Sequence, residues 1–110
     1  MKQKYCLLIS TINNIEEGRK IASHLVENHF VACVNLVPGI ESIYRWENKV
    51  STDSEILMLM KTEVSKVANV KKAIRELHSY DTPELIVVPI RGGIKRYLQW
   101  VSESVREKSK

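Results

Sequence analysis

The chain has 110 residues, of which 44% are hydrophobic and 27% are charged, so we expect a single folded domain over residues 1–110 rather than a disordered chain. Much of the net charge of +4 lies near the end of the chain. The sequence has no dense basic face interleaved with aromatic residues, so we expect no nucleic-acid partner. No apolar run approaches the roughly 20 residues of a membrane helix, and the short N-terminal apolar run lacks a cleavage site. We therefore expect a cytoplasmic protein with no membrane partner, whose Cys6 and Cys33 are free thiols.

The first half of the chain alternates between strand patterns and a helix pattern. Residues 4–12 are apolar and partly β-branched, which predicts a buried strand, and the apolar spacing of three and four over residues 15–29 predicts an amphipathic helix. Residues 30–37 return to strand character, and Pro38-Gly39 is expected to end that strand and turn the chain. Residues 40–47 then alternate between two faces, as a further strand does.

The second half repeats this order of elements. Residues 55–61 are apolar on both faces, which predicts a central strand covered by a helix layer on one side and a partner subunit on the other. A helix is expected over residues 62–78, an edge or bulged strand over residues 84–90 because of Pro89, and a short helix over residues 94–105. The order β-α-β-β-α-β plus a terminal helix predicts an α+β, ferredoxin-like fold. In it we expect the first and third strands to lie side by side in parallel.

A set of separated motifs spans residues 5–101 in a consistent order. The motifs are Ala32-Cys33-Val34-Asn35, Val37-Pro38-Gly39, Ser42-Ile43-Tyr44-x-Trp46-Glu47-x-Lys49, Glu55, Lys61-Thr62, Leu77-His78-x-Tyr80-x-x-Pro83-Glu84 and Tyr97-Leu98-x-Trp100. Together they resemble the CutA family, the divalent-cation tolerance proteins. The resemblance implies a ferredoxin-like subunit in a stable homotrimer that binds divalent metal ions such as copper and contributes to the response to metal ions.

The sequence offers no constellation of catalytic residues. Arg91-Gly92-Gly93 is only a weak anion nest, and no motif suggests a Ser-His-Asp or Cys-His arrangement. We therefore expect a binding protein rather than an enzyme. No organic cofactor is indicated, and the partners that we expect are divalent metal ions and further copies of the chain.

His78 and Cys33 are the candidate metal ligands. A neutral imidazole suits copper and zinc, and a thiolate binds Cu(I) well. In family members credited with copper sites, the resemblance implies a histidine pair and a cysteine; here His78 matches the second histidine, while Leu77 and Ser10 stand at the other two positions. The alternative for His78 is a cap at the end of a helix, and for Cys33 it is packing as a small buried hydrophobe.

A second candidate site combines aromatic and charged residues. The resemblance places Tyr44, Trp46, Lys61, Tyr80 and Glu84 together in clefts between subunits, where they could bind a small anion. The alternative is that the aromatic residues pack at the subunit interface while Lys61 and Glu84 form an interfacial ion pair.

These sites support three functional hypotheses. The first is a homotrimeric divalent-cation tolerance protein that acts by binding metal. The second is a ligand-sensing or signalling module that resembles the trimeric PII-type regulators and binds a small anion in inter-subunit clefts, an analogy at the level of the fold. The third is an interaction protein whose trimer presents a surface to a partner.

Overall fold

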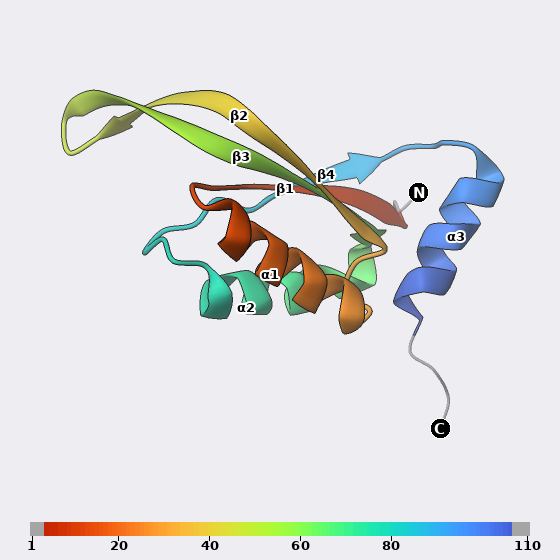
Figure 1. The fold of residues 1–110 in the computed structure, drawn as a ribbon. Helices are drawn as coiled ribbons and strands as arrows, with labels where there is room; N and C mark the ends of the chain where they lie inside the picture. The colour runs from red at the N-terminus through yellow and green to blue at the C-terminus, as the bar shows by residue number, and fades with distance from the viewer. Residues whose placement is uncertain (1–3, 107–110) are drawn as a thin grey trace.

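The computed structural model describes residues 4–106, in which a four-stranded sheet carries three helices (Figure 1). The strands lie in the order β2-β3-β1-β4, and each neighbouring pair is antiparallel. Along the chain the elements are β1 (Tyr5–Ile12), α1 (Ile15–Glu27), β2 (Cys33–Trp46), β3 (Lys49–Glu63), a 3₁₀ turn (Val64–Lys66), α2 (Val67–Leu77), β4 (Ile86–Ile90) and α3 (Lys95–Val105). The predicted order of elements is confirmed. None of these helices of residues 4–106 is long and apolar enough to cross a lipid bilayer.

The pairing of β1 with β3 differs from the prediction in direction. The two strands are neighbours as expected, but Tyr5 lies opposite Glu63 and Ile12 opposite Ile56, so the predicted parallel pairing is wrong. The connections explain the difference. The crossover through α1 makes β1 and β2 run in the same direction, and the β2–β3 hairpin reverses the chain and inserts β3 between them.

The main hydrophobic core lies between one face of the sheet and the helices α1 and α2 (Figure 1). Leu8 of β1 and Met58 of β3 are fully buried there, together with Leu25 of α1 and Ile74 of α2. Helix α1 begins at Ile15 because the Asn14 side chain accepts a hydrogen bond from the backbone N–H of Glu17 at 3.0 Å, which satisfies a free donor of the first turn. The strand predicted over residues 4–12 and the helix that follows it are therefore confirmed.

The β2–β3 hairpin extends well beyond the helices, and the molecule measures 48 × 31 × 22 Å as a result (Figure 1). Pro38-Gly39 does not turn the chain as predicted, because β2 runs through both residues to Trp46. Instead, the register with β3 shifts between Val37 and Ile40, and Gly39 adopts a φ of 78° that glycine tolerates without steric cost. The pair thus forms a bulge that bends the strand rather than ending it.

The opposite face of the sheet is apolar and only partly covered. Helix α3 packs at one end of it, where Val101 and Val105 contact Ala32 and Tyr5. Strand β4 lies at an edge of the sheet, as Pro89 predicts. Half-buried or exposed apolar side chains from all four strands share the rest of this open face: Leu7, Ile9, Val37, Leu57, Leu59, Ile86 and Val88.

Candidate functional site

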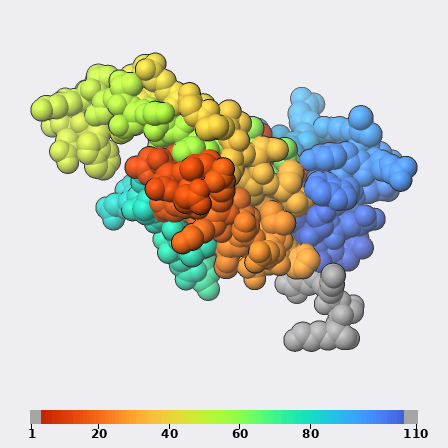
Figure 2. Space-filling model, viewed as in Figure 1, coloured from red at the N-terminus to blue at the C-terminus, as the bar shows by residue number. Residues whose placement is uncertain are grey.

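A cleft of about 630 Å³ lies where the outer part of the β2–β3 hairpin faces the connection between α2 and β4. In Figure 2 the hairpin reaches past the helices as an arm, with the segment near residue 80 below it. Three aromatic side chains line the cleft: Tyr44, Trp46 and Tyr80. Four carboxylates also line it: Asp53, Glu55, Asp81 and Glu84.

Hydrogen bonds to β1 and α1 hold the α2–β4 connection in place. Ser10, fully buried on β1, donates to the backbone oxygen of Glu84 at 2.7 Å. The backbone N–H of Ser79 donates to the Glu17 carboxylate, also at 2.7 Å. At the start of the connection, the Nε2 atom of His78 bonds the backbone oxygen of Thr11 at 2.7 Å. These contacts fix the wall that carries Tyr80, Asp81 and Glu84 relative to the sheet.

Two tyrosine–carboxylate pairs line the cleft, one within the hairpin and one that joins the hairpin to the α2–β4 connection. The Tyr80 hydroxyl donates to Glu55 at 2.5 Å, and the Tyr44 hydroxyl donates to Asp53. Burial, followed by the hydrogen bond to Glu55, raises the pKa of Tyr80 above its usual value. The hydrogen bond to Asp53 is the main cause that raises the pKa of Tyr44. Both phenols therefore stay neutral at physiological pH and act as donors to the carboxylates.

Of the five residues expected to share a cleft, the structure brings together Tyr44, Trp46, Tyr80 and Glu84. Lys61 lies elsewhere, because it is six residues farther along β3 than Glu55, where it is paired with Leu7 of β1 and Cys33 of β2. There its ammonium group donates to the Asn35 side chain. The Lys61–Glu84 ion pair is expected between subunits and stays a prediction; within one chain the two side chains are not paired.

His78 is used structurally at both ring nitrogens. Its Nε2 atom donates to the Thr11 oxygen, and its Nδ1 atom accepts the backbone N–H of Tyr80 at 3.0 Å. The side chain is 7% exposed, and the Tyr80 ring lies over it at 4.5 Å between centroids. This arrangement matches the alternative of a histidine that closes the end of α2 and leaves no ring nitrogen free for a metal.

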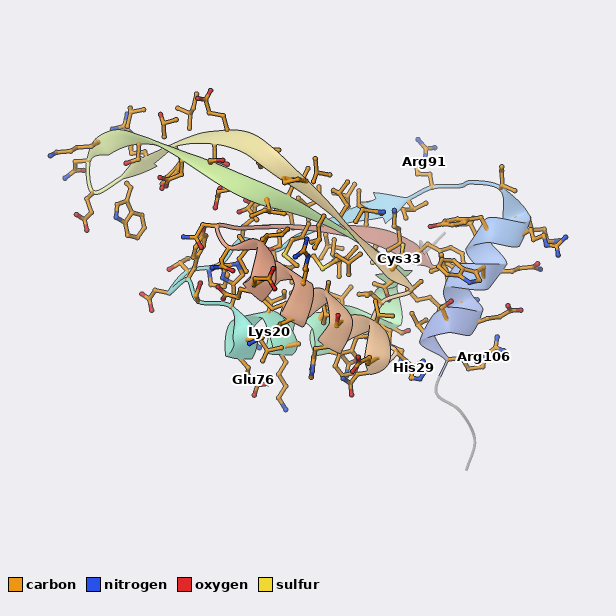
Figure 3. The ribbon with its side chains drawn as sticks, viewed as in Figure 1. Lys20, His29, Cys33, Glu76, Arg91 and Arg106 are labelled. Atoms are coloured by element: carbon orange, nitrogen blue, oxygen red, sulfur yellow. The ribbon has the colours of Figure 1, made fainter. Side chains whose placement is uncertain are left out.

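Cys33 lies at the start of β2 beside α3 (Figure 3), whereas His78 follows α2 and bonds the Thr11 oxygen near the end of β1. Its sulfur is 3.9 Å from the Tyr97 hydroxyl, and burial is the main cause that raises the pKa of Tyr97. Both cysteines are free, as predicted, and Cys6 is buried in the core. The two predicted metal ligands are thus not brought together within one chain.

Three of the four cleft carboxylates, Asp53, Glu55 and Asp81, are not among the site residues expected from the sequence. Asp53 and Glu55 alternate along β3, and the hairpin register sets Asp53 opposite Ser42, on the same face as Tyr44 and Trp46. Asp81 comes three residues before Glu84 in the α2–β4 connection, with Pro83 between them. The i, i+2 spacing of Asp53 and Glu55 on a strand was the available signal.

The cleft as a whole is suited to a cation. Its lining includes four carboxylates, and no lysine, arginine or histidine of residues 4–106 lines it. Neither Asp81 nor Glu84 has a side-chain hydrogen bond or ion pair with another described residue, whereas the buried Glu55, 8% exposed, bonds Tyr80. A small anion would be repelled here, so the geometry does not favour the anion-binding hypothesis.

Known proteins resemble this chain over most of its length. The chain is 41% identical over 98 residues to the divalent-cation tolerance protein CutA of Thermus thermophilus, covering 89% of this chain and 95% of that relative. It is 46% identical over 96 residues to the chloroplastic protein CutA of Arabidopsis thaliana, covering 87% of this chain. The chain spans only about half of that plant relative, 53% of its length.

Solved structures agree with the fold. The crystal structure of CutA1 from Oryza sativa superposes with a TM-score of 0.91 at 40% identity, over 96% of this chain and 97% of the other. The divalent cation tolerance protein from Thermus thermophilus gives a TM-score of 0.90 at 39% identity, over 93% of this chain and 99% of the other. The family model described as CutA1 divalent ion tolerance protein matches residues 6–104. This chain therefore belongs to the CutA1 divalent ion tolerance family.

Proposed function

We propose that this protein contributes to divalent-cation tolerance as a homotrimer that binds divalent metal ions, copper among them, at the cleft formed by the hairpin and the α2–β4 connection. The observation that carries the proposal is the charge of this cleft, where Asp53, Glu55, Asp81 and Glu84 have no lysine, arginine or histidine of residues 4–106 among them. Carboxylate oxygens are ligands for divalent cations, and affinity along the first transition row is highest for copper.

The carboxylates of one chain do not form a finished coordination site. Within residues 4–106, no three His, Cys, Asp or Glu side chains lie close enough together to hold a metal ion. A tight site would therefore need the walls of the cleft to close further or a neighbouring copy to add a ligand. Asp81 and Glu84 are the most available ligands because their carboxylates have no partner among the described residues.

Association into a trimer is supported by the open face of the sheet. Leu57, Leu59 and Val88 lie on this face, which is too apolar to be favourable in water, and β4 leaves a strand edge unpaired. A second copy of the chain could cover the face and pair with the edge. Light scattering should then report a mass three times the chain's 12.7 kDa, and Leu59→Glu should lower it. A wild-type mass of one chain would contradict the proposal.

The metal proposal is tested by calorimetric titration of the full chain with CuCl₂, followed by the chlorides of other divalent ions. The double variant Asp81→Asn, Glu84→Gln should weaken binding at least about tenfold, since it removes two of the four charges. Glu41→Gln is the matched control, because Glu41 is an exposed β2 residue outside the cleft. Binding that is unchanged in the double variant, or lost only in His78→Ala, would overturn this site.

A further inference from the structure

The cleft has a second property that metal binding does not use, namely its aromatic walls. Tyr44 and Trp46 come from β2 and Tyr80 from the facing connection. Tyr44 is 40% exposed and Trp46 is 56% exposed, so their rings are open to a ligand. The volume of about 630 Å³ lies in the range of roughly 300–1,000 Å³ that is typical of small-molecule sites.

The electrostatics of the cleft restrict which small molecules it can hold. Four carboxylates line it without a lysine, arginine or histidine of residues 4–106. The most enclosed of them, Glu55, accepts a hydrogen bond from the Tyr80 hydroxyl, which places a carboxylate beside the aromatic wall. An anion would be repelled, and a neutral molecule would leave the carboxylates uncompensated. A positively charged ligand is the complement.

The open arrangement of the carboxylates in one chain also suits an organic cation. A divalent metal needs several oxygen atoms that converge on one point, and the described residues offer no such group of three. An alkylated ammonium ion is larger and more weakly hydrated, and it binds through the faces of aromatic rings. We propose that this cleft is a binding site for small organic ammonium ions, held between Trp46, Tyr44 and Tyr80 with Asp81 and Glu84 supplying the counter-charge.

This inference shares the acidic cleft with the proposed function, but it does not depend on metal coordination. Tyr44 and Trp46 share one face of the hairpin with Asp53, because Ser42 lies opposite Asp53 and side chains two residues apart on a strand point the same way. The Asp53–Tyr44 hydrogen bond fixes the orientation of one ring, and the Glu55–Tyr80 bond fixes another. A ligand would therefore enter a site whose aromatic walls are already positioned.

The test is a titration of the full chain with tetramethylammonium chloride, in which the NMR signals of the two indole N–H groups are measured at each ligand concentration. The indole of Trp46 should shift in a saturable manner, whereas Trp100 on α3, which does not line the cleft, is the internal control. Neutral tert-butanol, of similar shape, and sodium chloride at equal ionic strength should give no saturable shift. Equal shifts with tert-butanol, or shifts that do not saturate, would overturn the inference.

Variants separate the two contributions to binding. In calorimetric titrations, Trp46→Ala should weaken tetramethylammonium binding at least about threefold, as expected for the loss of one ring contact. Glu84→Gln should weaken it as well and keeps both indole signals, whereas Trp100→Ala should leave it unchanged. Binding that is insensitive to both cleft variants would refute the site. Ammonium binding without copper binding would disprove only the proposed metal function, and copper binding without ammonium binding would disprove only this inference.

Discussion

The two ends of the β2–β3 hairpin lie in opposite environments. At the end beneath the helices, Met58 and Met60 of β3 are fully buried between the sheet and α1 and α2. At the far end, Ile43 is 65% exposed and Val50 is 69% exposed, and no helix covers them. This difference in burial shows that the two ends of the hairpin have different roles. The covered end stabilises the fold, and the projecting end presents the side chains of the cleft.

The largest effect is expected from a change in the covered part. Leu8→Ala removes a fully buried side chain from between β1 and the helices, and should lower the free energy of unfolding by about 2–5 kcal/mol. Ile43→Ala on the projecting part should change it by less than about 0.5 kcal/mol, because that side chain is mostly solvated. Urea unfolding of both variants at one protein concentration checks this contrast. Equal losses would show that the projecting part also carries the stability of the fold.

A smaller loss is expected at the residue that ties the cleft wall to the sheet. His78→Ala removes bonds to the Thr11 oxygen and the Tyr80 N–H, both in a buried setting, and should cost about 1–3 kcal/mol of unfolding free energy. Glu76→Ala, a change at an exposed site on α2 (Figure 3), is the control and should cost less than about 0.5 kcal/mol. Thermal unfolding measures the stability of both variants. Equal stability losses for His78→Ala and Glu76→Ala would contradict the role of His78 in holding the cleft wall.

The junction between the two parts of the hairpin offers a third comparison. Gly39 has a φ of 78° and its added Cβ would meet nothing, so Gly39→Ala should destabilise the chain by about 1 kcal/mol through backbone strain alone. Gly92→Ala adds a Cβ that also meets nothing, at a backbone without positive φ, and should be neutral or slightly stabilising. Urea unfolding of the pair isolates the strain of the bulge. A Gly39→Ala variant as stable as the wild type would mean that the bulge can adopt another backbone geometry.

The smallest effect concerns the pH dependence of the cleft. Because burial and the hydrogen bond to Glu55 raise the pKa of Tyr80 above the usual value of 10, the folded chain keeps a proton that the unfolded chain loses above pH 10. This contribution to stability is complete below pH 10 and is lost as the pH rises beyond it. Tyr80→Phe should therefore lose less stability than the wild type when unfolding is measured at rising pH above 10. A steeper loss of stability above pH 10 in Tyr80→Phe than in the wild type would contradict this contribution of the Tyr80 proton to stability.

Much of the fold could be predicted from local patterns. The alternation over residues 4–12 and the spacing over residues 15–29 are properties of single elements, and both elements appear where expected. The direction of β3 beside β1 and the bulge at Pro38-Gly39 depend on how distant strands pair, which local periodicity does not encode. The same limit explains why β3 begins at Lys49, earlier than its apolar run.

The candidate site was predictable only in part, for a similar reason. Tyr44, Trp46, Tyr80 and Glu84 could be grouped by resemblance to a family, and the structure places them around one cleft. Asp53 joins them through the hairpin register, which sets it opposite Ser42. Lys61 is excluded because it lies six residues beyond Glu55 along β3, which is roughly 20 Å at about 3.3 Å per residue, and there it is paired with Leu7 and Cys33.

Crystallography of the full chain grown with copper chloride shows whether the acidic cleft binds the divalent cation. An anomalous difference map at the copper edge should show a peak beside the carboxylates of Asp81 and Glu84, in the cleft below the hairpin. The same peak should be lost from crystals of the double variant Asp81→Asn, Glu84→Gln. A peak only at His78 or Cys33, or no peak from saturated protein, would show that the cleft is not the metal site.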